Sequence, residues 1–241
     1  MNIALILSGG TGSRLGANIP KQYVEVDKRP ILSYSLECLS CHKDIDVIWI
    51  VAEPDWQERI LGWLPRYDSG RKFRGFSLPG TNRQLSIYHG LEDMKEFAGT
   101  QDSVLIHDAA RPLLSARLIT DCLGAIQGHD GVLPVLPMKD TVYESEDGKS
   151  ITSLLDRKRI FAGQAPEVFR FGKYFDANKR LMPEAILHIN GSTEPAVMAG
   201  MDMVMIPGEE CNYKITTWTD LERFREEMEK EIVRERQFGG V

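Results

Sequence analysis

The feature that most constrains the fold of this chain is a regular alternation of short apolar runs with amphipathic segments. The first run, IALILS, is apolar without a break and leads directly into glycines. Such a run is typical of a strand covered on both faces of a parallel sheet. Further strand-like runs lie at 48–53, 73–80, 103–112, 131–137 and 203–208, and helix-like segments at 31–42, 55–67, 84–97, 116–127, 172–181 and 219–236. This order predicts an α/β fold with a Rossmann-like, doubly wound and mostly parallel sheet, whose ligands bind beyond the carboxyl ends of the strands.

Length and charge limit the class of protein further. The chain has 241 residues, which suits a single domain over 1–241, and its net charge is −6. Because general nucleic-acid binding needs a basic surface, nucleic acid is not expected as a partner. No apolar stretch approaches the ~18 residues that indicate a membrane span. The start MNIALILSGG lacks the basic region and the cleavage site of a signal peptide, so we expect a cytoplasmic protein with no membrane partner.

The segment CLSCH has the spacing of a c-type haem attachment site. Cys38 and Cys41 are followed by His42, which is the required pattern. Attachment of haem c normally needs export, and the segment continues an amphipathic helix that begins after Pro30, so we interpret the match as chance. No second CxxC or HxxxH pair completes four zinc ligands. We expect free thiols at all four cysteines, Cys38, Cys41, Cys122 and Cys211.

Residues 139–163 interrupt the alternation of strands and helices. They alternate apolar and polar side chains around Asp147-Gly148, a pair typical of tight turns. This pattern predicts a β-hairpin. An added hairpin of this kind is often an arm for a partner subunit, and the alternative is an ordinary surface hairpin. We predict a β-arm at about 139–163 that mediates dimerisation.

The glycine-rich stretch SGGTGSRLG follows the first strand. Gly9, Gly10 and Gly12 allow the backbone to approach an anion closely and to turn N–H groups toward it. The stretch is not a Walker A loop, and the spacing from Gly12 to Gly16 does not fit the dinucleotide fingerprint. Glu53, the acidic residue that ends the second strand, is also farther away than the ~20 residues typical of that fingerprint. An NAD-dependent oxidoreductase is therefore a less favoured alternative.

Two basic residues accompany this loop. Arg14 lies on it, and Lys21 follows seven residues later, directly after Pro20. Cations beside a phosphate-binding loop suit a reaction in which negative charge builds up on a triphosphate, where they and a metal ion would stabilise that charge. No candidate nucleophile lies here, so we expect the attacking group to belong to a second substrate.

An ordered series of motifs covers nearly the whole chain. The motifs are SGGTGSRLG (8–16), PKQY (20–23), GTNRQLSI (80–87), HDAARP (107–112), DT (140–141), DR (156–157), GQAPEVF (163–169) and NYKITTWTDL (212–221). With them the chain resembles the nucleotidyltransferases, and in particular the cytidylyltransferase family of the 2-C-methyl-D-erythritol 4-phosphate and ribitol-5-phosphate enzymes. The resemblance implies a single nucleotidyltransferase domain that transfers CMP from CTP to one of these polyol phosphates and releases pyrophosphate.

The resemblance also implies a role for each matching residue. The cations implied to be catalytic are Arg14, Lys21, Arg157 and Lys214. The residues implied to bind CTP are Ser8, Gly9, Gly10, Thr11, Gly12, Gly80, Arg83 and Ser86. The residues implied to bind the acceptor are Arg111, Thr141, Arg157 and Thr193. Asp108 is implied to lie beside Mg²⁺, and the arm is implied to insert into the partner of a homodimer.

Some of these residues have a simpler interpretation. Gly80 and Ser86 are implied to read the cytosine, but Ser86 is otherwise an ordinary helix residue. Asp108 is otherwise a helix cap, and Arg157 a solvated charge on the hairpin.

Two positions depart from the family pattern, and both belong to the acceptor side. Ala165-Pro166-Glu167 stands where the family usually has Thr-Pro-Gln, and Glu194-Pro195 alters the segment after Thr193. The acceptor therefore stays open at this point. Alternatives are a nucleotidyltransferase of another polyol or sugar phosphate, and a CTP-binding homologue without turnover. A uridylyl or guanylyl transferase would differ between Gly80 and Ser86.

Overall fold

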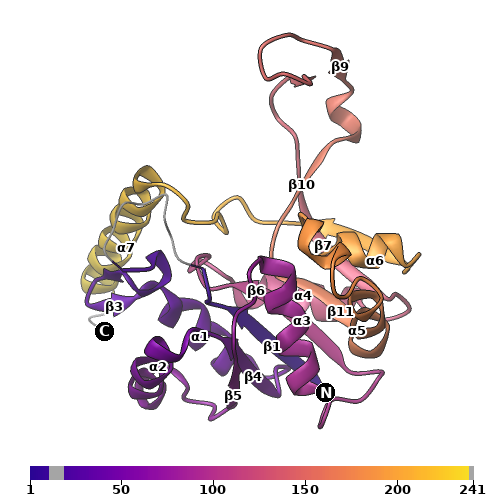
Figure 1. Cartoon of the computed structure of the whole chain (residues 1–241). Coiled ribbons are helices and arrows are strands. Elements are labelled where there is room, and N and C mark those ends of the chain that lie inside the picture. The colour runs from indigo at the N-terminus through magenta and orange to yellow at the C-terminus, as the bar shows by residue number, and fades with distance from the viewer. Residues whose placement is uncertain (11–18, 239–241) are drawn as a thin grey trace.

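The computed structural model describes residues 1–10 and 19–238, with side chains up to residue 230, and shows an α/β fold around one large sheet (Figure 1). Of the predicted site residues, Thr11, Gly12 and Arg14 lie outside the described residues. The large sheet contains β1 (Asn2–Leu7), β4 (Val47–Val51), β5 (Phe73–Ser77), β6 (Ser103–Asp108), β7 (Gly131–Pro137), β10 (Phe161–Gly163), β11 (Glu167–Arg170) and β12 (Met203–Pro207).

The strand order confirms the predicted mostly parallel sheet and adds one feature. The strands follow the order β10-β7-β11-β6-β1-β4-β5, and β12 pairs with β7. β1 pairs in parallel with both β4 and β6, and the pairs β4–β5 and β12–β7 are parallel too. β11 runs antiparallel between β6 and β7, and β10 is also antiparallel to β7. These two antiparallel strands were not predicted from the sequence.

Helices cover both faces of the sheet, as a doubly wound fold requires. They are α1 (Ile31–Cys41), α2 (Pro54–Tyr67), α3 (Arg83–Met94), α4 (Ala116–Ala125), α5 (Phe171–Lys179), α6 (Glu194–Met198) and α7 (Trp218–Phe238). Short elements complete the chain: the 3-10 helices η2 (Lys21–Tyr23), η3 (Arg157–Arg159) and η4 (Ala185–His188), and the strand pair β2 (Glu25–Val26) and β3 (Arg29–Pro30).

Successive residues of β1 belong to two different hydrophobic clusters. Ala4 and Ile6 pack with side chains of α1, α2 and α4 on one face. Ile3 and Leu5 pack with side chains of α3 and α5 on the other face. All four are fully buried, which explains why the strand is apolar at every position from Ile3 to Leu7 rather than at alternate positions.

The predicted hairpin is confirmed, although its turn is longer than a two-residue turn. β8 (Val142–Glu144) pairs antiparallel with β9 (Ser153–Leu155), and the pair stands well away from the body at the top of Figure 1. The Asp147 carboxylate accepts hydrogen bonds from the backbone N–H groups of Lys149 and Ser150. Gly148 has φ +68°, a conformation that favours glycine. The connection between the strands is thus a loop organised by Asp147.

The cysteines are free thiols, as predicted. Cys38 packs against the core, and the ring of His42 hydrogen-bonds Thr120. Among the described side chains, those of residues 1–10 and 19–230, no group of three or more His, Cys, Asp or Glu could hold a metal ion. In the same ranges no helix is long and apolar enough to cross a membrane.

Candidate active site

A cavity of about 820 Å³ opens where β1, β4 and β6 end. Its position agrees with the prediction that ligands bind beyond the carboxyl ends of the strands. The lining residues come from the glycine loop, the segment before α3, the end of β6 and the segment before α7. They are Leu7, Gly9, Gly10, Lys21, Gln22, Glu53, Gly80, Thr81, Asn82, Arg83, Ser86, Asp108, Ala110, Lys214 and Thr216.

The cavity brings together many of the predicted residues from distant parts of the chain. Those that line it are Gly9, Gly10, Lys21, Gly80, Arg83, Ser86, Asp108 and Lys214. Those that do not are Ser8, Arg111, Thr141, Arg157 and Thr193. Gln22, Glu53, Asn82 and Thr216 line the cavity without having been predicted. Gln22 lies inside the PKQY motif, so a signal for it was present.

The glycine loop is closely packed where the structure describes it. A Cβ atom on Gly9 would lie 2.4 Å from Cβ of Pro79, so no larger residue fits there. Ser8 is buried, and its hydroxyl donates to the hydroxyl of Tyr23 (2.9 Å) rather than facing the cavity. Gly9 is therefore required by contact with the neighbouring loop.

The start of α3 forms one wall of the cavity. The Asn82 side chain caps the helix by accepting from the N–H of Leu85 (2.7 Å). The hydroxyl of Ser86 accepts from the N–H of Gly80 (2.9 Å) and donates to the carbonyl of Asn82 (2.9 Å). A Cβ atom on Gly80 would lie 2.5 Å from the Leu85 side chain. Ser86 is therefore not an ordinary helix residue, because its side chain fixes the preceding loop.

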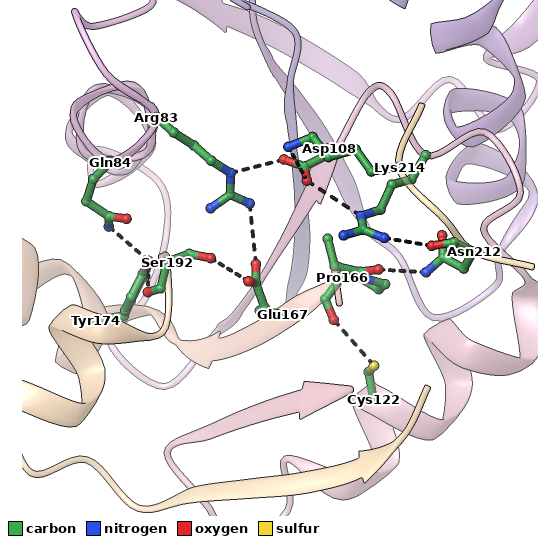
Figure 2. Close-up of polar contacts among 12 residues, drawn as sticks. Arg83, Gln84, Asp108, Cys122, Pro166, Glu167, Tyr174, Ser192, Asn212 and Lys214 are labelled. Atoms are coloured by element: carbon green, nitrogen blue, oxygen red, sulfur yellow. Dashed lines mark hydrogen bonds and ion pairs between the residues drawn. The ribbon is translucent and has the colours of Figure 1, made fainter. Parts of the chain in front are cut away.

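Asp108 ends β6 and lies among three cations (Figure 2). Its carboxylate lies 3.0 Å from Nε of Arg83, 3.0 Å from Nζ of Lys214 and 3.6 Å from Nε of Arg111. Burial alone would raise the pKa of Asp108, but the charges of Arg83, Lys214 and Arg111 hold it well below its usual range. The carboxylate is ionised at neutral pH. The alternative that Asp108 serves only as a helix cap is wrong, because its side chain binds cations.

A second buried carboxylate contacts Arg83 from the other side. Nη2 of Arg83 lies 3.6 Å from Oε2 of Glu167, and Oε1 of Glu167 accepts from the Ser192 hydroxyl (2.5 Å). Burial raises the pKa of Glu167, while the charge of Arg83 opposes the rise. The carbonyl of Ser192 accepts from the hydroxyl of Tyr174 (2.7 Å), which also accepts from Gln84 (3.1 Å). Figure 2 shows these contacts as a continuous series that runs from Gln84 through Tyr174, Ser192 and Glu167 to Arg83.

This arrangement gives the departure at Glu167 a physical meaning. Where the resemblance noted in the sequence implies an uncharged glutamine, this chain has a carboxyl group that pairs with Arg83. The guanidinium thus bridges Asp108 at the end of β6 and Glu167 in the antiparallel strand β11.

The residues predicted to bind the acceptor are not gathered in this cavity. Arg111 is largely buried, and its Nη1 donates to the carbonyl of Asn212 (2.7 Å). Thr193 lies at the start of α6. Thr141 and Arg157 belong to the exposed arm, where Nη1 of Arg157 donates to the carbonyl of Lys139 (2.8 Å). Their roles stay predictions.

Comparison with known proteins gives a consistent result. Residues 2–229 match the family model described as 2-C-methyl-D-erythritol 4-phosphate cytidylyltransferase (IspD). The chain is 32% identical over 238 residues to the ribitol-5-phosphate cytidylyltransferase of Streptococcus pneumoniae serotype 2 (strain D39 / NCTC 7466), covering 96% of this chain and 100% of the relative.

Solved structures resemble the fold over the same length. The 4-diphosphocytidyl-2C-methyl-D-erythritol synthase from Anaerococcus prevotii DSM 20548 superposes with a TM-score of 0.79 at 26% identity, covering 95% of this chain and 96% of the other. The Francisella tularensis 2-C-methyl-D-erythritol 4-phosphate cytidylyltransferase gives a TM-score of 0.77 at 23% identity, covering 92% and 97%. The second similarity is evidence of a shared fold only.

Proposed function

The chain belongs to the 2-C-methyl-D-erythritol 4-phosphate cytidylyltransferase (IspD) family, and from this membership we infer what its cavity does. It is a CTP-dependent cytidylyltransferase that acts on polyol phosphates. A phosphate oxygen of the acceptor attacks the α-phosphorus of CTP. The bond from that phosphorus to the oxygen bridging the β-phosphate breaks, and pyrophosphate leaves. No covalent enzyme intermediate is needed, so positioning and charge stabilisation supply the catalysis.

The hydrogen bonds of Ser86 support recognition of cytosine. A hydroxyl offers one proton and two lone pairs. The proton is used on the carbonyl of Asn82, and one lone pair accepts from Gly80 N–H. In the cavity wall Ser86 therefore has only an acceptor left. Cytosine has an amino group where uracil has a carbonyl oxygen, so this acceptor favours CTP over UTP.

The cations of the cavity suit the triphosphate. Lys21 and Lys214 line it together with the glycine loop, and Arg83 lies at its base between two carboxylates. We assign Lys21 and Lys214, with Arg14 of the same loop, to stabilising the charge that develops as pyrophosphate leaves.

We propose Mg²⁺ as the metal ion of this reaction. Mg²⁺ is commonly held by one or two carboxylates together with substrate phosphates, and it neutralises phosphate charge in such reactions. Asp108 is ionised and lines the cavity, so its carboxylate fits this requirement. Asp108 would hold the ion jointly with the phosphates of CTP.

We propose ribitol 5-phosphate as the acceptor, with 2-C-methyl-D-erythritol 4-phosphate as the second candidate. The curated relatives that are 32% identical over 238 residues support the first. The description of the family and the names of solved relatives support the second. Both are acyclic polyol monophosphates that offer a terminal phosphate to CTP, so the reaction is the same.

We further propose that the chain forms a homodimer through its arm. Ile151, Leu154 and Tyr143 on the arm are 68%, 66% and 54% exposed. Exposed apolar side chains on a projecting element favour burial against a partner chain. In such a dimer Thr141 and Arg157 would reach the acceptor site of the partner. A cytoplasmic location stays a prediction.

Pyrophosphate release in the presence of CTP and Mg²⁺ tests the proposal directly. The acceptors to compare are ribitol 5-phosphate, 2-C-methyl-D-erythritol 4-phosphate, and other pentitol and tetritol phosphates. We expect release with ribitol 5-phosphate to exceed release with the others, and UTP to be a poor substitute for CTP. Binding of CTP without release on any acceptor would instead favour a homologue without turnover.

A further inference from the structure

Gln22 and Tyr23 directly follow Lys21 in η2 and contact the glycine loop. Both side chains are buried, with 3% exposure each, and Gln22 also lines the cavity. Neither belongs to the residues assigned to nucleotide binding.

The side-chain amide of Gln22 contacts two carbonyl groups of the loop at once. Its Nε2 donates to the carbonyl of Ser8 (2.6 Å) and to the carbonyl of Gly10 (2.8 Å). A primary amide nitrogen has two N–H groups, so both are used on this loop. One side chain therefore fixes two peptide groups at the cavity wall.

Tyr23 holds the same loop from a neighbouring position. Its hydroxyl donates to the carbonyl of Ser8 (2.9 Å) and accepts from the hydroxyl of Ser8 (2.9 Å). The ring of Tyr23 stacks on Trp56 of α2, with centroids 3.9 Å apart and planes at 16°. Pro79 contacts the loop at Gly9, where no Cβ atom fits. Several contacts thus hold the described start of the loop, Ser8 to Gly10, in place.

The direction of these hydrogen bonds affects how well the start of the loop can bind an anion. A phosphate is attracted by backbone N–H groups and repelled by carbonyl oxygens. Carbonyl groups beside a triphosphate must therefore be bound by donors of the protein. Gln22 supplies such donors to Ser8 and Gly10 at the edge of the cavity.

We propose that Gln22, assisted by Tyr23, is a positioning residue. It donates hydrogen bonds to the carbonyl groups of Ser8 and Gly10 and so orients the start of the glycine loop, Ser8 to Gly10, for the triphosphate of CTP. This inference rests on the proposed function, because it takes the loop to be the phosphate site. It concerns phosphate binding and not recognition of the base.

Binding measurements by calorimetry test this role, with CTP, inorganic tripolyphosphate and the nucleoside cytidine as probes and Mg²⁺ present. Gln22→Met keeps the size of the side chain and removes its donors. We expect it to weaken binding of CTP and of tripolyphosphate about tenfold, with cytidine unchanged. Gln22→Glu should bind CTP and tripolyphosphate more weakly still, because a carboxylate cannot donate hydrogen bonds to the two carbonyl groups. Tyr23→Phe removes both hydrogen bonds between the Tyr23 hydroxyl and Ser8, and should weaken binding of both phosphate ligands severalfold.

Gln57→Glu is the matched control for added charge. The Gln57 amide donates to the carbonyl of Ala52 (3.0 Å), and the residue does not line the cavity. This variant should bind tripolyphosphate like wild type. Binding of tripolyphosphate by Gln22→Met within about twofold of wild type would overturn the inference. Equal weakening of cytidine and tripolyphosphate would do the same.

Three further outcomes separate effects on folding and on turnover from the proposed role of Gln22. If Gln22→Met unfolds at a much lower temperature, Tyr23→Phe decides: severalfold weaker tripolyphosphate binding supports the inference and unchanged binding overturns it. If wild type binds CTP and tripolyphosphate but turns over no acceptor, the proposed reaction fails, while the binding comparison still decides the role of Gln22. If wild type binds neither phosphate ligand, the inference is overturned as well.

Discussion

At the scale of single residues, the hydroxyl of Ser86 has most of its hydrogen-bonding capacity used by the protein itself. It joins the N–H of Gly80 to the carbonyl of Asn82 and leaves one acceptor in the cavity wall. A side chain whose proton is committed in this way distinguishes an amino group from a carbonyl oxygen. If Ser86 contacts the base as proposed, the choice between pyrimidine bases depends in part on the Asn82 carbonyl, which takes up the hydroxyl proton.

Replacement of Ser86 tests this account of base recognition. Ser86→Ala leaves the N–H of Gly80 without its partner and removes the acceptor. We expect kcat/KM for CTP to fall about tenfold or more and the preference for CTP over UTP to shrink. Steady-state kinetics with both nucleotides measures this. Ser145→Ala, on the exposed arm loop, is the control and should keep the preference. An unchanged CTP to UTP ratio in Ser86→Ala would remove Ser86 from base recognition.

Glu167 supports a prediction on the pH dependence of stability. Its folded-state pKa is raised by burial, against the opposing charge of Arg83. A raised pKa means that the folded state binds the proton more tightly, so this contribution to stability is present at low pH and is lost as pH rises through the folded pKa. Glu167→Gln cannot ionise. The difference in melting temperature, variant minus wild type, should therefore become more positive as pH rises from the acid range through the folded-state pKa of Glu167.

Thermal unfolding followed by circular dichroism across that pH range measures the difference. Glu92→Gln is a suitable comparison, because Glu92 has a pKa lowered mainly by its hydrogen bond with Lys95. A difference for Glu167→Gln that stays constant or falls with pH would contradict the expected direction.

At the scale of elements, the site depends on where the strands end and on the segments that come directly after them. β1 leads into the glycine loop, β6 ends at Asp108, and the segment after β5 leads to the capped start of α3. The antiparallel strand β11 brings Glu167 beside Arg83, although the two are far apart in sequence. In the arm, β8 and β9 pair only with each other in a separate two-stranded sheet, while β10 at the end of the arm joins the large sheet beside β7.

The exposed apolar side chains of the arm lead to a prediction at this scale. Leu154→Asp places a charge on a side chain that is 66% exposed in the single chain. If the arm is buried in a dimer, the charge should shift the protein toward the mass of one chain, 27.2 kDa, and lower turnover. Light scattering measures the mass. Leu61→Asp, on a leucine of α2 that is 49% exposed, is the control and should leave the mass as in wild type.

At the scale of the whole molecule, each chain holds the proposed CTP site in its body and the predicted acceptor residues Thr141 and Arg157 on its arm. In Figure 1 the arm extends away from the body of its own chain. A complete acceptor site is therefore expected only when the arm of one chain meets the body of another. The oligomer would then be required for catalysis.

Mixing two inactive variants tests this arrangement. We expect Lys21→Ala and Arg157→Ala each to abolish most turnover. If Arg157 serves the partner subunit, each mixed dimer has one intact site. Subunit exchange in an equal mixture should then restore roughly a quarter of wild-type activity. No recovery, with exchange verified by a tag on one variant, would show that each chain uses its own Arg157.

The sequence by itself determined the parts of this protein that depend on local pattern. Apolar runs predicted most strands of the large sheet, and amphipathic segments predicted most of the helices that cover it. The alternating residues around Asp147 predicted the hairpin. The ordered motifs predicted the family and most of the residues that line the cavity. These features are readable because periodicity and motif order are properties of neighbouring residues.

The tertiary structure alone decided which side chains form ion pairs and hydrogen bonds with one another. Nothing local indicates that β11 inserts antiparallel beside β6, so the contact of Glu167 with Arg83 was not predicted. The same holds for Gln22, which lies in a predicted motif but whose amide binds the carbonyl groups of Ser8 and Gly10. Such contacts join residues that are distant in sequence. They form only when the sheet has brought the ends of its strands together. These contacts determine where the site presents charges and hydrogen-bond donors and acceptors.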